Sequence, residues 1–462
     1  MPHRRSRRAS MLCRALLLAL ALTALLSASA FARVLIVTKR SVSYPHLNTI
    51  QKAVNKARKG DWVLIDKGKY PETVKVKTAG LHLRGVDRNK VIVDGRHRKN
   101  VNGIEVSKAN GVYIENLTVR NFDRPNSGGD NGNEIWWNGG DGSGKIGMSG
   151  WYGQYLTTYD TGLLGGYGIF MSNAVNGSLK HVYASGFNDS GVYLGACRDC
   201  HGLIDDATVE RSALGYSGTN SGGHIVVKNS TFRNNSVGVS PNSLNNDDQP
   251  PPQDGACDSG SNTTPTPTFA STDVQRCTIF EHNTVVNNNN LTAPANPTLL
   301  RLPWGIGFEL PGTYADLIRN NTIKGNPNFG ILAHENPDPY PPVASTIEFQ
   351  VSGMRFENNK LSGNGTRAGG ADIGLEGGAF GTGSVNNCFT GNTFATSNPA
   401  NIEGTWGCQN ATTPQGGVDL LLKILALVDE SSARHQKAQK APGNQKTMPR
   451  PCRGVPKNKL CG

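Results

Sequence analysis

Apolar residues recur along this chain in a pattern that starts with glycine. Six glycines each precede a segment whose first residue is apolar or aromatic and whose third residue is uncharged: Gly168, Gly191, Gly215, Gly238, Gly307 and Gly330. Successive glycines lie 23 or 24 residues apart, apart from one interval of 69 residues. A fixed period of this length indicates one structural unit that is stacked on copies of itself.

Each segment is predicted to be a short strand with one face turned inward, because alternate side chains of a strand point to the same side. The first inward set is Ile169, Val192, Tyr216, Val239, Phe308 and Ile331, and the second is Met171, Leu194, Gly218, Pro241, Leu310 and Ala333. One such strand cannot bury a core alone. Parallel strands stacked about 4.8 Å apart would bury a continuous one.

Asparagines precede several of the predicted strands. They are Asn116, Asn229, Asn283, Asn321, Asn359 and Asn392. Asparagine tolerates left-handed backbone and satisfies its own backbone at tight bends, which favours an interpretation as turn residues. Stacked asparagine amides can also hydrogen-bond to one another along an axis, so ladders are the alternative.

The opening segment adds a further feature, because residues 49–57 have the apolar spacing of a short helix and residues 59–65 and 68–74 have that of strands. Together with the glycine repeat and the asparagines, this order resembles right-handed parallel β-helix proteins of the pectin-lyase-like superfamily, over roughly residues 34–410. The resemblance implies an all-β solenoid whose N-terminal helix caps the first coil, where an open edge would invite aggregation. That superfamily contains lyases, hydrolases, epimerases and inert scaffolds, so it does not specify an activity.

The two ends of the chain differ from the repeat. Residues 1–32 combine arginines, an apolar run and a small-residue cleavage site after Ala32, the layout of a signal peptide for the general or the twin-arginine route. Residues 33–412 are predicted to form the β-helix domain. Residues 413–462 are predicted to contain a short apolar helix over 418–428, which would serve as a C-terminal cap, followed by a basic tail. No other run is long enough to cross a bilayer, so we expect no membrane span in the mature chain and a secreted or cell-surface monomer.

Charge and cysteines narrow the functional classes. The net charge of +12 comes from the two ends, because residues 33–430 hold 34 basic and 35 acidic residues. A nucleic-acid-binding domain is therefore not supported. Eight cysteines remain after the signal, and their spacing predicts four local disulfides: Cys197/Cys200, Cys257/Cys277, Cys388/Cys408 and Cys452/Cys461. A redox role or half of a zinc site is the alternative for the first pair.

Two insertions are predicted to interrupt the repeat, near residues 123–166 and 242–276. The first is rich in glycine and aromatic residues, and its predicted substrate-binding residues are Trp136, Trp137, Trp151 and Tyr152. Aromatic faces stack on sugar rings, and exposed clusters of them are unusual on a soluble surface. The alternative is that this loop folds back over the wall of the solenoid.

Charged residues supply the candidate chemistry. The resemblance implies that a site lies at outward strand positions and in the loops that follow, where the candidate catalytic residues are Arg198, Asp199, Asp247, Asp248, Glu309, His334 and Glu335, with Asp338 nearby. Asp205 and Asp206 are the predicted metal ligands. Surface turns and salt bridges are the alternative for each group, since the signature motifs of the polygalacturonases and the alginate epimerases are missing.

Two reaction types fit these residues. A polyuronate lyase needs a base and a cation that stabilises the carboxylate, which Arg198 and a Ca²⁺ ion held by aspartates would provide. A hydrolase needs carboxylates on both sides of a sugar, which Glu309, Glu335 and Asp338 could supply.

The leading hypothesis is an exported protein that binds, and processes as a lyase, hydrolase or epimerase, an extracellular polysaccharide or cell-wall polymer, with a polyuronate as one candidate. Ca²⁺ is the one cofactor considered. The alternative is a non-catalytic scaffold or adhesin that its basic tail holds at the cell envelope. A metal-delivery accessory is a third hypothesis, which the scatter of histidines disfavours.

Overall fold

The computed structural model describes residues 32–125, 129–197, 199–244, 277–337, 348–377, 386–409 and 418–462. The chain divides into two units, residues 1–33 and 34–462, and all elements described below belong to the second. Within the described ranges, no helix has the length and apolarity needed to span a bilayer.

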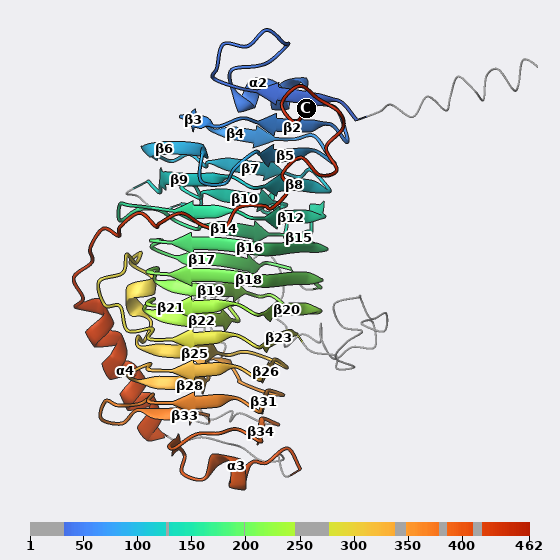
Figure 1. The fold of residues 1–462 in the computed structure, drawn as a ribbon. Helices are drawn as coiled ribbons and strands as arrows, with labels where there is room; N and C mark the ends of the chain where they lie inside the picture. Colours follow the sequence, from blue (N-terminus) through green and yellow to red (C-terminus); the bar gives the residue numbers. More distant parts are fainter. Residues whose placement is uncertain are drawn as a thin grey trace, which may run out of the picture. The chain divides into compact units, whose positions relative to one another are not determined.

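The described residues between 34 and 409 form a parallel β-helix whose complete coils contribute strands to three columns (Figure 1). One column is an eleven-stranded sheet of β4 (Val74–Val76), β7 (Ile104–Ser107), β10 (Ile135–Asn138), β14 (Ile169–Ser172), β17 (Ser190–Gly195), β19 (Leu214–Thr219), β22 (Val237–Asn242), β25 (Ile306–Pro311), β28 (Phe329–His334), β33 (Ala371–Leu375) and β35 (Ser397–Asn398). All of its pairings are parallel. The predicted parallel solenoid is therefore confirmed.

The other two columns make up one twenty-stranded sheet that turns a corner, because β16 and β18 run through both columns. Its strands are β1 (Val34–Val37), β2 (Trp62–Ile65), β3 (Gly68–Tyr70), β5 (His82–Gly85), β6 (Val91–Lys99), β8 (Val112–Glu115), β9 (Thr118–Asp123), β12 (Trp151–Gln154), β13 (Thr157–Tyr159), β16 (Gly177–Ser185), β18 (Gly202–Glu210), β20 (Ile225–Lys228), β21 (Thr231–Arg233), β23 (Thr278–Glu281), β24 (Thr284–Val286), β26 (Leu317–Arg319), β27 (Thr322–Lys324), β31 (Arg355–Glu357), β32 (Lys360–Ser362) and β34 (Cys388–Thr390). Two small sheets pair β11 (Met148–Ser149) with β15 (Ala174–Val175) and β29 (Asn336–Pro337) with β30 (Glu348–Phe349).

The glycine repeat marks one position in six consecutive strands of the eleven-stranded sheet, β14 to β28. The residue after each glycine is fully buried, as predicted. The glycines are needed because neighbouring backbones approach closely: a Cβ atom at Gly238 would lie 2.5 Å from the carbonyl oxygen of Gly307, and one at Gly307 equally close to that of Gly330. The repeat is therefore a steric requirement of coil stacking.

The predicted insertion at 123–166 is largely a regular coil. β10 pairs with β7 and β14, and β12 and β13 continue the other two columns. The glycine pattern does not reveal this coil, because Glu134 stands directly before β10, where the following coils have glycine. Most of the second predicted insertion, residues 245–276, lies outside the described residues.

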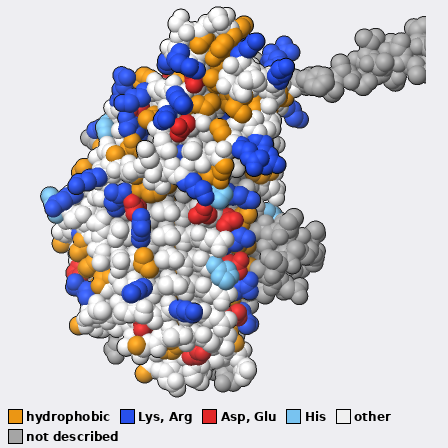
Figure 2. Space-filling view, in the orientation of Figure 1, with side chains coloured by type: hydrophobic (Ala, Val, Ile, Leu, Met, Phe, Trp, Pro, Cys, Tyr) orange, Lys and Arg blue, Asp and Glu red, His pale blue; other side chains and the backbone are white. Residues whose placement is uncertain are grey.

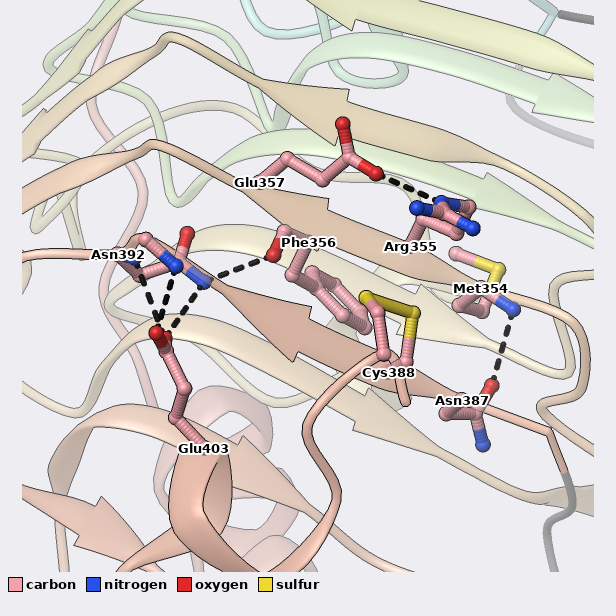
Figure 3. The surroundings of a disulfide bond; sticks show 10 residues. Met354, Arg355, Phe356, Glu357, Asn387, Cys388, Asn392 and Glu403 are labelled. Carbon is pink, nitrogen blue, oxygen red and sulfur yellow. Dashed lines mark hydrogen bonds and ion pairs between the residues drawn. A yellow bond between two sulfur atoms is a disulfide. The ribbon is translucent and has the colours of Figure 1, made fainter. Parts of the chain in front are cut away.

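Asparagine ladders run along two corners of the C-terminal half. In one, Asn283, Asn321 and Asn359 each donate a backbone N–H to the Oδ1 atom of the next ladder asparagine, at 2.9, 3.1 and 3.0 Å, and Asn392 is the last acceptor. Glu403 accepts the N–H of Asn392 at 3.2 Å and ends the ladder (Figure 3). The second ladder contains Asn235, Asn288, Asn326 and Asn364.

The other two predicted asparagines are turn residues. Asn116 and Asn229 have left-handed φ values of 54° and 52° and lie at the corner of the twenty-stranded sheet. Both interpretations of the asparagines are thus realised, at different positions of the corner.

Short helices cover both ends of the solenoid. Helix α2 (Ile50–Lys56) begins at the cap residue Thr49 and buries Ile50, Ala53 and Val54 against the first coil, which confirms the predicted N-terminal cap. At the other end, α3 (Ile402–Thr405) follows the last coil and buries Ile402. The Cys388–Cys408 disulfide links the chain just after α3 to β34 of that coil (Figure 3).

Helix α4 (Val418–Ser432) forms as predicted but is not an end cap. It lies along the side of several coils (Figure 1), beside the 3-10 helix η3 (Leu299–Arg301). Its buried residues Leu420, Ile424 and Leu427 pack in one cluster with Leu214, Val237, Trp304, Ile306, Phe329, Leu332 and Ala371. The apolar stripe therefore covers apolar side chains on the flank of the solenoid.

The basic tail returns along the outside of the solenoid towards the N-terminal coils (Figure 1). Its backbone or side chains contact Thr292, then Asn89, then Asn116 and finally Arg84. In the view of Figure 2, basic side chains are most frequent over the N-terminal half. Three predicted disulfides, Cys197–Cys200, Cys388–Cys408 and Cys452–Cys461, are confirmed, and Cys257 of the fourth pair lies outside the described residues.

Candidate functional site

One row of equivalent side chains runs along the outer wall of the eleven-stranded sheet, and most of its members are covered by other parts of the chain, since only Glu105 and Trp136 are not buried. In register, coil by coil, it consists of Glu105, Trp136, Phe170, Tyr193, Ser217, Ser240, Glu309 and Leu332. Between Trp136 and Glu309, which are five coils or about 24 Å apart, the row changes from aromatic to hydroxyl to carboxylate side chains. A small pocket at the ends of β19 and β22 is lined by residues including Gly218, Pro241 and Asn242.

The predicted catalytic residues Glu309 and His334 are brought together at the C-terminal part of this row. The Nε2 atom of His334 lies 3.2 Å from Oε1 of Glu309, and the hydroxyl of Ser240 donates to the other carboxylate oxygen. The Nδ1 atom of His334 lies 2.7 Å from the carbonyl oxygen of Glu335. The Glu309 side chain is fully buried, whereas that of His334 is 9% exposed, so the imidazole is the outer member of the pair.

The environment of His334 favours its charged form. Burial lowers the pKa of this imidazole, but the hydrogen bond to Glu309, its negative charge, the carbonyl of Glu335 and the charge of Glu376 together raise the pKa above its usual value. Glu335 and Glu376 are buried beside the pair, where the backbone N–H of Glu335 donates to the Glu376 carboxylate at 3.1 Å. Sequence reasoning missed Glu376, which follows β33 as Glu335 follows β28.

The four predicted sugar-binding aromatics separate into three environments. Trp137 and Trp151 are fully buried in the core, so the prediction that they contact a sugar is wrong. They occupy inward positions of β10 and β12, because alternate strand residues face opposite sides. Trp136 is half-buried in the outward row and stacks on Phe170, with ring centroids 5.0 Å apart.

Tyr152 lies in a different column. It is half-buried and ends an outward stack of rings on the twenty-stranded sheet that also contains Trp62, His82 and Tyr113, with centroids 4.0 to 4.5 Å apart. Trp136 and Tyr152 therefore do not share one binding surface.

Asp199 belongs to a separate cluster on the turns that connect the eleven-stranded sheet to the next column. Its Oδ1 atom lies 3.1 Å from Nε2 of His201 and 3.1 Å from Nδ1 of His224. Burial raises the pKa of Asp199, but hydrogen bonds and charge from both imidazoles outweigh it and hold that pKa well below its usual range. Sequence reasoning singled out Asp199 but missed His224, which is 25 residues away in the next coil.

The remaining predicted residues are not gathered at either cluster. Asp205 accepts from the amide of Asn229 at 2.8 Å, and Asp206 lies 2.6 Å from His181, both at the corner of the twenty-stranded sheet. Neither aspartate belongs to a group of three metal-binding side chains among the described residues, and the Ca²⁺ site stays a prediction. Arg198, Asp247, Asp248 and Asp338 lie outside the described residues.

A buried acidic cluster at the third corner was not predicted. Asp123 ends β9, and Asp160 directly follows β13 in the neighbouring coil. Their Oδ1 atoms lie 3.1 and 3.6 Å from Nδ1 of His97. Burial, with the charge of Asp123, raises the pKa of Asp160 to about 6, although His97 and two backbone N–H groups lower it. Burial and the charge of Asp160 also raise the pKa of Glu134 well above its usual value, and Glu134 Oε2 has no hydrogen-bond partner.

Comparison with known proteins reveals the fold alone. No family model matches the sequence, and no curated protein matches it. Among solved structures, the chain is similar to the family 28 exopolygalacturonase of Yersinia enterocolitica, with a TM-score of 0.50 and 11% identity, covering 79% of this chain and 72% of that one. At these identities the likeness concerns architecture only.

Two further structural matches have lower scores. The A-module of mannuronan C-5 epimerase AlgE6 of Azotobacter vinelandii has a TM-score of 0.45 and 14% identity, covering 75% of this chain and 83% of that one. Pectin methylesterase PemA of Erwinia chrysanthemi has a TM-score of 0.36 and 14% identity, covering 74% of this chain and 91% of that one. The three neighbours are polysaccharide-processing β-helix enzymes.

Proposed function

Because the chain has the right-handed parallel β-helix fold of the pectin-lyase-like proteins, we propose that it binds an extracellular polysaccharide lengthwise along the outward row of the eleven-stranded sheet. The row itself supports this proposal most strongly. It carries the half-buried Trp136, stacked on Phe170, towards one end and the Glu309–His334 pair towards the other, with buried hydroxyl groups between them. A chain of sugars laid along the axis would stack on Trp136 and reach the exposed edge of His334 further along the same wall.

We assign acid–base chemistry to His334. It is the member of the buried pair that reaches the surface, and its raised pKa makes it a proton donor near neutral pH. Glu309 is a positioning residue, since Ser240 and His334 already occupy both of its oxygens. Proton transfer of this kind fits a lyase or an epimerase better than a hydrolase, which needs two carboxylates that both face the sugar.

Binding is tested with affinity electrophoresis of the purified exported chain in gels that contain polyuronates or neutral polysaccharides. The Trp136→Ala variant should migrate as fast in a gel that contains the polymer as in a gel without it, because the substitution removes the aromatic face on which a sugar would stack. Tyr152→Ala is the matched control, since it removes a half-buried aromatic from the adjacent column of the same coil. Equal losses in the two variants, or none in either, would contradict binding along the row.

Catalysis is tested by unsaturated-uronate absorbance, by reducing ends and by proton exchange into the polymer from deuterated water. His334→Asn should abolish the activity and weaken binding less than Trp136→Ala does, because the stacking face stays in place. Glu309→Gln should retain part of it and shift its pH profile to lower pH, because the imidazole loses its stabilising charge. If no polymer that binds is altered under any of these assays, the protein is a binding module.

The tail supports the alternative of attachment to an anionic envelope polymer. Its backbone is docked on the solenoid, but Lys437, Lys440, Lys446 and Arg450 are exposed. Disulfides of the kind present in this structure fit an extracytoplasmic location. Reversal of these four charges should release the protein from cell envelopes if the tail holds it there, and high salt should do the same.

A further inference from the structure

We propose that Asp199, His201 and His224 form a binding site for a divalent transition-metal ion of the Zn²⁺ type. The three side chains come from two neighbouring coils and meet on the turns that precede β18 and β20. This site is separate from the Glu309–His334 pair and does not depend on the proposed polysaccharide function.

Coil stacking places the two imidazoles. β18 and β20 pair in parallel with Gly202 opposite Ile225, so the residues that precede them, His201 and His224, occupy the same position of successive coils. Their rings stack with centroids 4.5 Å apart and planes 18° apart. Both residues have left-handed backbone, with φ values of 48° and 59°. The fold therefore aligns two nitrogen ligands without help from a metal.

The distances match those between ligands of one metal ion. Oδ1 of Asp199 lies 3.1 Å from a ring nitrogen of each histidine, and the three ligand atoms all lie within 4.8 Å of one another. Ligands at 2.0–2.1 Å from a tetrahedral Zn²⁺ ion are about 3.3 Å apart. Small rotations of these side chains would therefore admit the ion, which would replace the protons now shared with Asp199.

The carboxylate is both held and accessible. Asp199 lies between Cys197 and Cys200, whose disulfide closes the turn and whose side chains are fully buried. The Asp199 side chain is 48% exposed, that of His201 22% and that of His224 2%. An ion can enter from the Asp199 side, while the His224 ring forms the fixed base of the site.

The donor set selects the class of metal. Two imidazoles and one carboxylate suit Zn²⁺ and similar ions, whereas Ca²⁺ requires six to eight oxygen ligands. Three protein ligands leave a fourth position for water or for an oxygen atom of a bound molecule.

The test is metal binding by the exported full-length chain after EDTA treatment, with Zn²⁺ measured by mass spectrometry after dialysis and Co²⁺ followed by its visible absorption. We expect one ion per chain with the strong absorption of a tetrahedral site. His201→Asn and His224→Asn should each weaken binding by more than the roughly 10–100-fold that loss of an outer-shell partner costs. Asparagine suits the left-handed backbone here, since Asn176 occupies the same position one coil earlier with a φ of 59°.

Two control variants make the result decisive. His181→Asn changes another left-handed histidine, which pairs with Asp206 but has no second imidazole, and it should not alter binding. His97→Asn tests the acidic corner cluster as the place of binding. The proposal is overturned if folded His201→Asn and His224→Asn bind Zn²⁺ as tightly as the native chain, if His97→Asn alone abolishes binding, or if the native chain takes up no ion.

Discussion

Asp160→Asn should stabilise the protein at neutral pH and have little effect in acid. The Asp160 side chain is fully buried, and its pKa of about 6 lies some two units above the usual value of 3.8. Because the folded state holds a proton that the unfolded state releases between these values, folding stability falls as the pH rises from about 4 to 6. Two pKa units correspond to about 3 kcal/mol, so the variant should gain roughly 1–3 kcal/mol at pH 7.5.

The structure indicates that asparagine fits this site. Oδ2 of Asp160 accepts the backbone N–H groups of Gly162 and Gly165 at 3.0 and 3.2 Å, and an amide oxygen can do the same. Among the described residues Oδ1 has no hydrogen-bond partner and lies 3.6 Å from Nδ1 of His97, so an amide group there would break no hydrogen bond.

The assay is urea unfolding at pH 4.5 and 7.5 in EDTA, followed by the fluorescence of the buried tryptophans of the same coil. The control is Asp141→Asn, because Lys108 and Ser143 hold the pKa of Asp141 below its usual range through hydrogen bonds. That variant should lose stability at pH 7.5 or show no change. A gain for Asp160→Asn that is equal at both pH values, or a loss at pH 7.5, would refute the assigned cause.

Three further predictions concern the scaffold. Gly238→Ala should lower stability by about 3 kcal/mol or more in thermal unfolding, because the new Cβ would clash with backbone of the next coil, whereas Gly443→Ala, with nothing within 4 Å, should not. Asn321→Ala should cost about 2–4 kcal/mol in urea unfolding, since it leaves the buried N–H of Asn283 without its acceptor. Deletion of residues 433–462 should lower the melting temperature and speed proteolysis of the N-terminal coils that the tail contacts; unchanged values would mean that the docked tail is energetically neutral.

The fold could be predicted in detail wherever it follows from the repeat. Inward residues such as Val239 and Phe308 are buried as their spacing requires, and the N-terminal helix caps the first coil. The coil that contains Trp137 was missed because a glutamate replaces its glycine, so tryptophans that belong to the core looked like an exposed loop. The spacing of glycines identifies a coil only where the coil has a glycine at the repeated position.

The clusters could be predicted only in part, for a different physical reason. A parallel β-helix brings together residues about one coil apart, and the loops make that separation vary. Asp199 and His224 are 25 residues apart, Glu309 and His334 also 25, but Asp123 and Asp160 are separated by 37. The sequence alone does not give the register between coils, so it does not identify which residue of the next coil each side chain contacts. It does indicate where each side chain lies relative to the nearest strand.

This geometry indicates where chemistry can arise on such a scaffold. Some columns of equivalent positions keep one residue type because stacking requires it, as the glycine column does, whereas others vary from coil to coil. Glu134 stands in the glycine column, and His201 and His224 follow an asparagine in theirs. Each departure lies beside a cluster of titratable side chains from neighbouring coils. The His201→Asn and His224→Asn variants should therefore separate metal binding from folding, because the same left-handed position already holds an asparagine one coil earlier.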